Sequence, residues 1–152
     1  MPTVHAMLVC DMVLKEAGTN KHSAIGIFTD VYASSYPMML NPLAIYVCLS
    51  DALGSYELSM ELVDLDQDKV LGRVQGLKLQ SKEKLQTHDF GIRFVNTVFQ
   101  HPGTYEFRLL ADGRLLGGKT LRVRALPQQP GGPGGQGGPG APQGGPPRGE
   151  PA

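Results

Sequence analysis

Apolar and polar residues alternate between Gly103 and Leu126 (GTYEFRLLADGRLLGGKTLRVRAL), as is typical of β-strands with one buried face. The alternation runs from Tyr105 to Ala111 and again from Leu121 to Ala125. Asp112-Gly113 lies between these two parts and favours a two-residue turn, because both residues tolerate positive φ. The segment therefore predicts a β-hairpin.

Two apolar runs near the N-terminus, residues 3–14 (TVHAMLVCDMVL) and residues 23–33 (SAIGIFTDVYA), each predict a strand. Glu16–Lys21 (EAGTNK) separates them and is rich in turn-forming residues, so we expect the two runs to pair as one long hairpin. Gly26 lies inside the second run, and a glycine at such a position indicates a bulge or the close approach of another chain segment.

The middle of the chain predicts further strands. Leu43–Ser50 is apolar on both faces and favours a central strand, whereas Tyr56–Leu62 alternates and favours a half-buried one. Strand patterns follow over residues 70–79 and 90–99. Ser34–Pro42 is expected to be a connection, because its prolines remove ladder donors. Its apolar residues either close one end of the core or form an adaptable methionine-rich surface.

These patterns predict about eight strands with turns about every 8–12 residues, and no stretch has a sustained helical period. We therefore expect an all-β fold over residues 1–126, an antiparallel two-sheet β-sandwich of immunoglobulin-like or C2-like type. Gly103–Tyr105 (G-x-Y), at a strand start, is typical of the tyrosine corner of immunoglobulin-like sandwiches. The Gly/Pro-rich residues 127–152 predict a disordered tail, either a flexible spacer or a proline-rich ligand.

Charge and hydropathy narrow the classes of function. The chain has 14 Lys and Arg against 14 Asp and Glu, so it lacks the basic excess that is typical of nucleic-acid binders. No apolar run reaches the ~18 residues of a membrane span, and the N-terminal MPTVHAMLVCDMVLKE lacks the basic start of a secretory signal. We expect a cytoplasmic protein without a membrane span and without a nucleic-acid partner.

The residues that could carry chemistry show little pattern. Cys10 and Cys48 lie in apolar runs outside any C-x-x-C motif, so we expect two buried free thiols, with a disulfide between adjacent strands as the alternative. The four histidines have no H-x-H or H-x-x-x-H spacing, and the chain has no P-loop, G-x-S-x-G or G-x-G-x-x-G motif. The sequence thus predicts no catalytic residue, no cofactor and no metal ligand.

Asp64, Asp66 and Asp68 form a D-x-D-x-D cluster, and hard cations prefer clustered carboxylate oxygens. An EF-hand loop would need Gly and Glu where Lys69 and Gln75 stand. The segment VDLDQDKVLG is similar to one calcium loop of C2 domains, but those domains need a second acidic loop. The alternative is a solvated turn in which the Asp side chains accept hydrogen bonds from local backbone amides.

Two arginines, Arg122 and Arg124, share the outer face of the last predicted strand, with Arg108 expected opposite them. They could form a basic strip. We interpret them as protection of an edge strand, because long charged side chains discourage edge-to-edge pairing.

Three segments, VHAMLVCDMV, SAIGIF and FVNTVFQHPGTYEFRLLADGRLLGGKTLRV, resemble a family of small bacterial proteins of unknown function. The resemblance covers most of residues 1–125. It implies a cytoplasmic β-sandwich and brings no established activity, catalytic residue or ligand.

From the sequence we expect a non-enzymatic protein-binding or scaffold module, in which a sheet face or edge binds an unidentified protein partner by packing or strand addition. One alternative is a calcium-dependent or lipid-surface module that uses Asp64, Asp66 and Asp68. The other is an enzyme whose site is assembled from residues distant in sequence.

Overall fold

A computed structural model describes residues 1–127 of the chain, and these residues form twelve strands and no helix. None of them belongs to a helix that could cross a membrane. The tail was predicted over residues 127–152, and all of it from residue 128 onward lies outside the described residues. The strands are β1 (Thr3–Cys10), β2 (Met12–Lys15), β3 (His22–Ile25), β4 (Asp30–Ala33), β5 (Met38–Leu40), β6 (Leu43–Ser50), β7 (Gly54–Asp64), β8 (Lys69–Ser81), β9 (His88–Phe94), β10 (Thr97–Phe99), β11 (Gly103–Ala111) and β12 (Arg114–Ala125).

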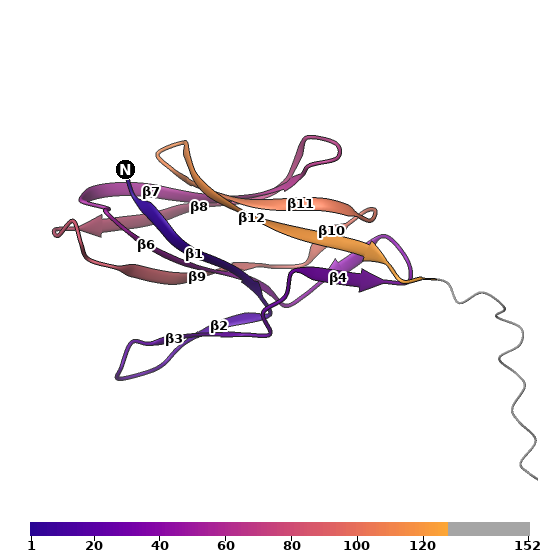
Figure 1. The fold of residues 1–152 in the computed structure, drawn as a ribbon, viewed down its shortest axis with the longest axis horizontal. Coiled ribbons are helices and arrows are strands. Elements are labelled where there is room, and N and C mark those ends of the chain that lie inside the picture. Colours follow the sequence, from indigo (N-terminus) through magenta and orange to yellow (C-terminus); the bar gives the residue numbers. More distant parts are fainter. Residues whose placement is uncertain (128–152) are drawn as a thin grey trace, which may run out of the picture.

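Two sheets stack to form a β-sandwich, which confirms the predicted fold class (Figure 1). One sheet has the order β1-β6-β9, and the other has the order β4-β12-β11-β7-β8. Two short pairs, β10-β5 and β2-β3, add to them. The β2–β3 hairpin stands beyond the three-stranded sheet, on the side away from the five-stranded one (Figure 1).

The core lies between the sheets because the strands alternate as the sequence predicts. β11 buries every second residue from Tyr105 to Ala111, and β6 buries apolar residues from Leu43 to Leu49. Phe94 of β9 and Phe107 of β11 meet edge to face across the sandwich, with ring centroids 5.2 Å apart. Packing of this kind makes the interior a single continuous apolar cluster.

The C-terminal hairpin forms where the alternation predicts it. β11 and β12 pair antiparallel, and Asp112 and Gly113 both take positive φ, 49° and 80°, in the turn between them. The turn is tied to β7, since Asp112 N donates to Glu57 O at 2.8 Å and Asp112 Oδ1 accepts from Glu57 N at 2.9 Å. The hairpin therefore supplies two neighbouring strands of the larger sheet.

The predicted tyrosine corner is also present. The hydroxyl of Tyr105 donates to the carbonyl of His101, four residues upstream, at 2.6 Å. Its ring is 1% exposed and packs edge to face on Phe99 at 4.8 Å. This bond fixes the entry of the chain into β11.

The long N-terminal hairpin and the count of eight strands were wrong. The run over residues 3–14 divides at Asp11: β1 pairs with β6, and only β2 pairs with β3. The second run divides after Ile25, and β4 joins the far sheet as a parallel neighbour of β12. Gly26 accounts for the second break, because it has a φ of 69° and its Cα lies against the Asp11 carboxylate, where a Cβ would sit 2.3 Å from Oδ2. The expected close approach at this glycine is confirmed.

The connection over Ser34–Pro42 contains one element that the prolines had argued against. β5 pairs with β10 for three residues between Pro37 and Pro42, each of which follows a cis peptide bond. Tyr36, Met38 and Leu40 pack on the core, whereas Met39 is exposed. Most of the connection therefore closes one end of the sandwich.

Candidate functional site

The β2–β3 hairpin and the surface beneath it form the most distinctive site in the described part of the chain. We call residues 11–26 the arm. Met12 is opposite Ile25 and Lys15 is opposite His22, so the ladder is regular over all four residues of each strand. Glu16 N donates to Lys21 O at 2.7 Å and closes the predicted turn. Asp11 N donates to Ile25 O at 2.9 Å and joins the two ends of the arm.

Val13 anchors the arm to the outer face of the three-stranded sheet. It lies directly over Gly91 of β9, where a Cβ would meet the Val13 Cβ at 2.6 Å. Gly91 is opposite Tyr46 of β6 in the ladder. Only a residue without a side chain at position 91 lets the arm approach this closely.

A second anchor joins polar side chains from three strands. His22 Nδ1 of the arm lies 3.0 Å from Asp89 Oδ2 of β9, at ion-pair distance but without the alignment of a hydrogen bond. Tyr46 of β6 donates its hydroxyl to the same oxygen at 2.9 Å. Burial and this bond to a carboxylate raise the pKa of Tyr46 to about 12, so Tyr46 remains a neutral donor.

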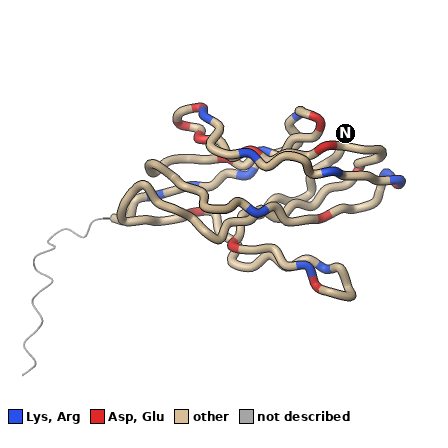
Figure 2. Tube along the Cα trace, turned by 180° about the vertical axis from the view of Figure 1, so that it is seen from behind, with Lys and Arg blue, Asp and Glu red and all other residues tan. Residues whose placement is uncertain are grey.

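The outward face of the arm is apolar. Met12, Leu14 and Ile25 point to the side opposite Val13, and their side chains are between 40% and 48% exposed. No charged residue lies along either strand between Asp11 at the base and Lys15 at the tip (Figure 2). We call these three side chains the arm face. A cluster of exposed aliphatic side chains on a projecting hairpin is typical of a binding surface.

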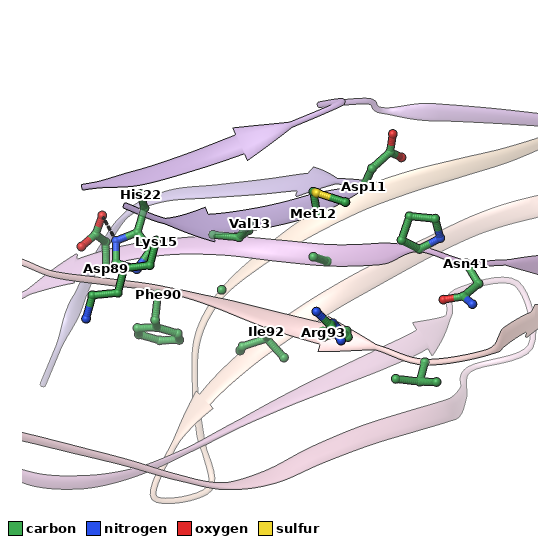
Figure 3. A pocket seen from close by; sticks show the side chains of 14 residues that line it. Asp11, Met12, Val13, Lys15, His22, Asn41, Asp89, Phe90, Ile92 and Arg93 are labelled. Atoms are coloured by element: carbon green, nitrogen blue, oxygen red, sulfur yellow. Dashed lines mark ion pairs between the residues drawn. The ribbon is translucent and has the colours of Figure 1, made fainter. Parts of the chain in front are cut away.

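An open groove runs between the arm and β9, and it is lined by consecutive residues from Asp89 to Arg93. Lys15, His22 and Asp89 gather at one end of the groove, and Asn41 and Arg93 lie at the other (Figure 3). Phe90 and Ile92 point from β9 away from the arm (Figure 3). The groove therefore follows the length of β9.

Two cations of the groove lack an ionic partner. Neither Arg93 nor Lys15 forms an ion pair with any residue in the range 1–127. Asp89 is already engaged by His22 and Tyr46, and the other carboxylate, Asp11, lies against Gly26 at the base of the arm. The groove thus has two unengaged cationic groups.

The acidic cluster is organised by hydrogen bonds within the protein. Asp64 is 2% exposed, and its Oδ1 accepts from the backbone amides of Asp66 and Gln67 at 3.0 and 3.2 Å. Its Oδ2 accepts from His101 Nε2 at 2.8 Å. Asp66 Oδ2 accepts from Thr104 N at 3.3 Å. These bonds match the turn that the sequence offered as the alternative, although Asp64 is buried rather than solvated.

His101 gains a proton more readily than an ordinary histidine. The Pro102 carbonyl, 2.7 Å from its Nδ1, is the main cause that raises the pKa of His101, and the Asp64 carboxylate adds to it while partial burial opposes it. Asp68 takes a positive φ of 51° in the same turn and forms none of the side-chain hydrogen bonds seen among residues 1–127. Within that range, no three His, Cys, Asp or Glu side chains are grouped as metal ligands.

Both cysteines are free, as expected. Cys10 is buried and Cys48 is half-buried. They lie on adjacent strands, but Cys10 is opposite Ala44 and Cys48 is opposite Ala6, so the two residues are offset by four positions. Burial and the nearby Asp11 carboxylate raise the pKa of Cys10, which keeps it in the unreactive thiol form.

The predicted role of the C-terminal arginines was wrong. β12 is not an edge at this point, because β4 pairs with it, and Arg122 and Arg124 both lie within ion-pair distance of Asp30 on β4, at 2.8 and 3.4 Å. Arg108 is opposite Gly118 and binds Glu106 at 2.6 Å. The three arginines therefore form no common strip.

Sequence reasoning missed the arm and its groove. The available signals were Asp11, which interrupts an apolar run, and Gly91, which interrupts an alternating strand. One further pair was missed: His5 Nε2 lies 2.6 Å from Ser50 Oγ, with no carboxylate in ion-pair contact with His5 among the described residues. A hydroxyl–imidazole pair of this kind lacks the third group that orients a catalytic base.

Comparison with protein families gives a match over most of the chain. The model of a family of unknown function, DUF6941, matches residues 5–124. No curated protein matches the chain.

Among solved structures, the chain is similar to an immunoglobulin-like protein of Pseudomonas aeruginosa, with 14% identity, a TM-score of 0.44, and coverage of 82% of this chain and 97% of that one. It is also similar to part of the alkylpurine DNA glycosylase AlkC of Pseudomonas fluorescens, solved with DNA containing an abasic site analog. The identity is 13% and the TM-score is 0.42, over 82% of this chain and 30% of that one.

Proposed function

The chain belongs to DUF6941, a family of unknown function, and we propose that it is a non-enzymatic module that binds another protein through the arm. The observation that best supports the proposal is the exposed arm face. Three aliphatic side chains, Met12, Leu14 and Ile25, are presented to solvent on a hairpin that is anchored from behind by Val13 and His22. A rigid apolar surface loses little conformational freedom on binding, so its burial translates into affinity.

The remaining features support the same proposal. The sheets give the arm a fixed base, and the groove beside it presents cations without ionic partners among residues 1–127. The neutral net charge disfavours a nucleic-acid partner. Two free thiols suit a reducing compartment, which supports our proposal of a cytoplasmic location.

The test is a capture experiment with the full chain as bait in cells of its source, followed by reconstitution with the purified partner. The variant M12S/I25S removes two of the three side chains of the arm face. We expect it to weaken binding of that partner by about tenfold or more, because exposed anchors of this size contribute about 1 kcal/mol each. The matched control is L115S, since Leu115 is 60% exposed at the distant β11–β12 turn.

Three results would contradict the proposal. They are the absence of any reproducible partner, equal affinity of M12S/I25S and the wild type, and equal losses in M12S/I25S and L115S. Thermal melting of both variants shows whether each remains folded. Because all the substituted residues are exposed, we expect their midpoints to stay close to that of the wild type.

A further inference from the structure

The groove beside the arm has the form of a site for one more strand. β9 pairs with β6 on one side only, and no other described strand pairs with its second side. In an antiparallel strand, alternate residues direct their N–H and C=O groups to opposite sides. About half of the backbone groups of His88–Phe94 therefore remain available as a hydrogen-bonding edge beside the groove.

The other sheet edges suit an incoming strand less well. β1, the second edge of the three-stranded sheet, has a register shift between Val4 and Ala6 in its ladder with β6, and β4 is only four residues long. β8 carries three cations, Lys69, Arg73 and Lys78, and its ladder with β7 shifts register twice. Charges and irregular register are devices by which edge strands resist pairing. β9 also carries charged residues, but its register with β6 is continuous over all seven of its residues.

The chemistry of the groove favours an acidic segment. Arg93 is exposed on the outward side of β9, and Lys15 of the arm is exposed as well. Neither residue forms an ion pair with another residue in the range 1–127. At the other end of the groove, Asp89 lies within ion-pair distance of His22 and accepts a hydrogen bond from Tyr46. A carboxylate on an incoming strand would meet an unengaged guanidinium at Arg93.

From this geometry we infer that β9 binds an extended segment of another protein as an added strand, and that a carboxylate of this segment pairs with Arg93. The inference rests on the proposed function and names the form of the partner. Backbone hydrogen bonds to β9 supply affinity, and the contact with Arg93 supplies selection. The arm covers one side of the bound segment, because Val13 holds it directly over the middle of β9.

The first experiment selects dodecapeptides from a randomised displayed library on the full chain. We expect enrichment of alternating, β-branched sequences that contain Glu or Asp. Hydrogen exchange with the best synthetic peptide should slow at the amides of residues 88–94. A counterpart that is N-methylated at alternate residues keeps its side chains but cannot form the ladder, and we expect its affinity to fall about 100-fold.

The second experiment tests the charge. R93Q should weaken peptide binding about fivefold, the effect of one exposed ion pair, and R93E should bind best to a peptide in which Lys replaces the acidic residue. The matched control R114Q, an exposed arginine at the β11–β12 turn, should bind like the wild type.

The inference is overturned if no peptide is enriched, if protection appears elsewhere but not in β9, if the N-methylated peptide binds equally well, or if R93Q and R114Q behave alike. A captured partner that depends on the arm face but does not protect β9 would overturn this inference and leave the proposed function intact. A partner that tolerates M12S/I25S would overturn the proposed function.

Discussion

At the scale of single residues, a few polar groups are buried inside the apolar sandwich and need hydrogen-bond partners there. Tyr105 and Asp64 are the clearest examples, because both are almost fully buried. The hydroxyl of Tyr105 donates to the carbonyl of His101, and the carboxylate of Asp64 accepts from the ring of His101. A buried polar group without a partner is costly, so each of these bonds matters more than an equivalent bond at the surface.

The tyrosine corner gives the first prediction. Tyr105→Phe removes the hydroxyl and leaves the His101 carbonyl without its donor, so we expect the free energy of unfolding to fall by about 1–2 kcal/mol. Urea denaturation measures the change. Tyr32→Phe is the control, because Tyr32 is 54% exposed and should give no loss. Equal effects of the two substitutions would contradict a structural role for the corner.

His101 gives a prediction about pH. Its pKa in the folded protein is raised above the ordinary value of 6.5, so the protonated ring stabilises the fold fully below that value and loses this contribution as pH rises through the higher folded pKa. We expect the thermal midpoint of the wild type to fall between about pH 6 and pH 8 relative to that of His101→Gln. Parallel melting profiles over this range would exclude a protonated His101–Asp64 pair.

At the scale of elements, the arm depends on a missing side chain in its neighbour. Gly91→Ala would place a methyl group against Val13, so the arm must move outward, and we expect a loss of about 1–3 kcal/mol and faster amide exchange in residues 11–26. Gly72→Ala is a matched control, since Gly72 is also in a strand but has open space around its Cα. It should change stability by less than about 0.5 kcal/mol.

Elements could be predicted from sequence where the alternation is uninterrupted. The β11–β12 hairpin and the central strand β6 agree with expectation because their apolar residues recur at every second position and the turn has the residues that positive φ requires. The separation of the arm from β1 was not predicted, since residues 3–14 look like one continuous strand and only Asp11 marks the point where the chain leaves the sheet. Pairing between distant segments, such as β4 with β12, has no local signal at all.

At the scale of the whole molecule, β12 is the last strand of the residues that the structure describes. Leu126 N donates to Ala33 O at 3.0 Å, and no buried residue follows Val123 among those described. A chain that ends at Leu126 should therefore melt in one transition within about 2 °C of the full chain.

A second truncation provides the control. A chain that ends at Thr120 lacks the buried residues Leu121 and Val123, and we expect it to be unfolded by circular dichroism. A drop of many degrees in the chain that ends at Leu126 would show that the last residues stabilise the body. Repeating the capture experiment with this chain also assigns partner recognition to the body or to the residues beyond it.

The closed base of the arm has a consequence for how such a domain diversifies. The hydrogen bonds from Asp11 N to Ile25 O and from Phe28 N to Val9 O hold the departing and returning chain together at 2.9 and 3.0 Å, so the base of the arm is closed whatever the length of the hairpin beyond it. Doubling the length of an inserted loop adds only about 0.6 kcal/mol of closure entropy. The arm can accordingly be exchanged for a hairpin of different length or amino-acid sequence, which would change the partner that the domain recognises while the two sheets stay the same.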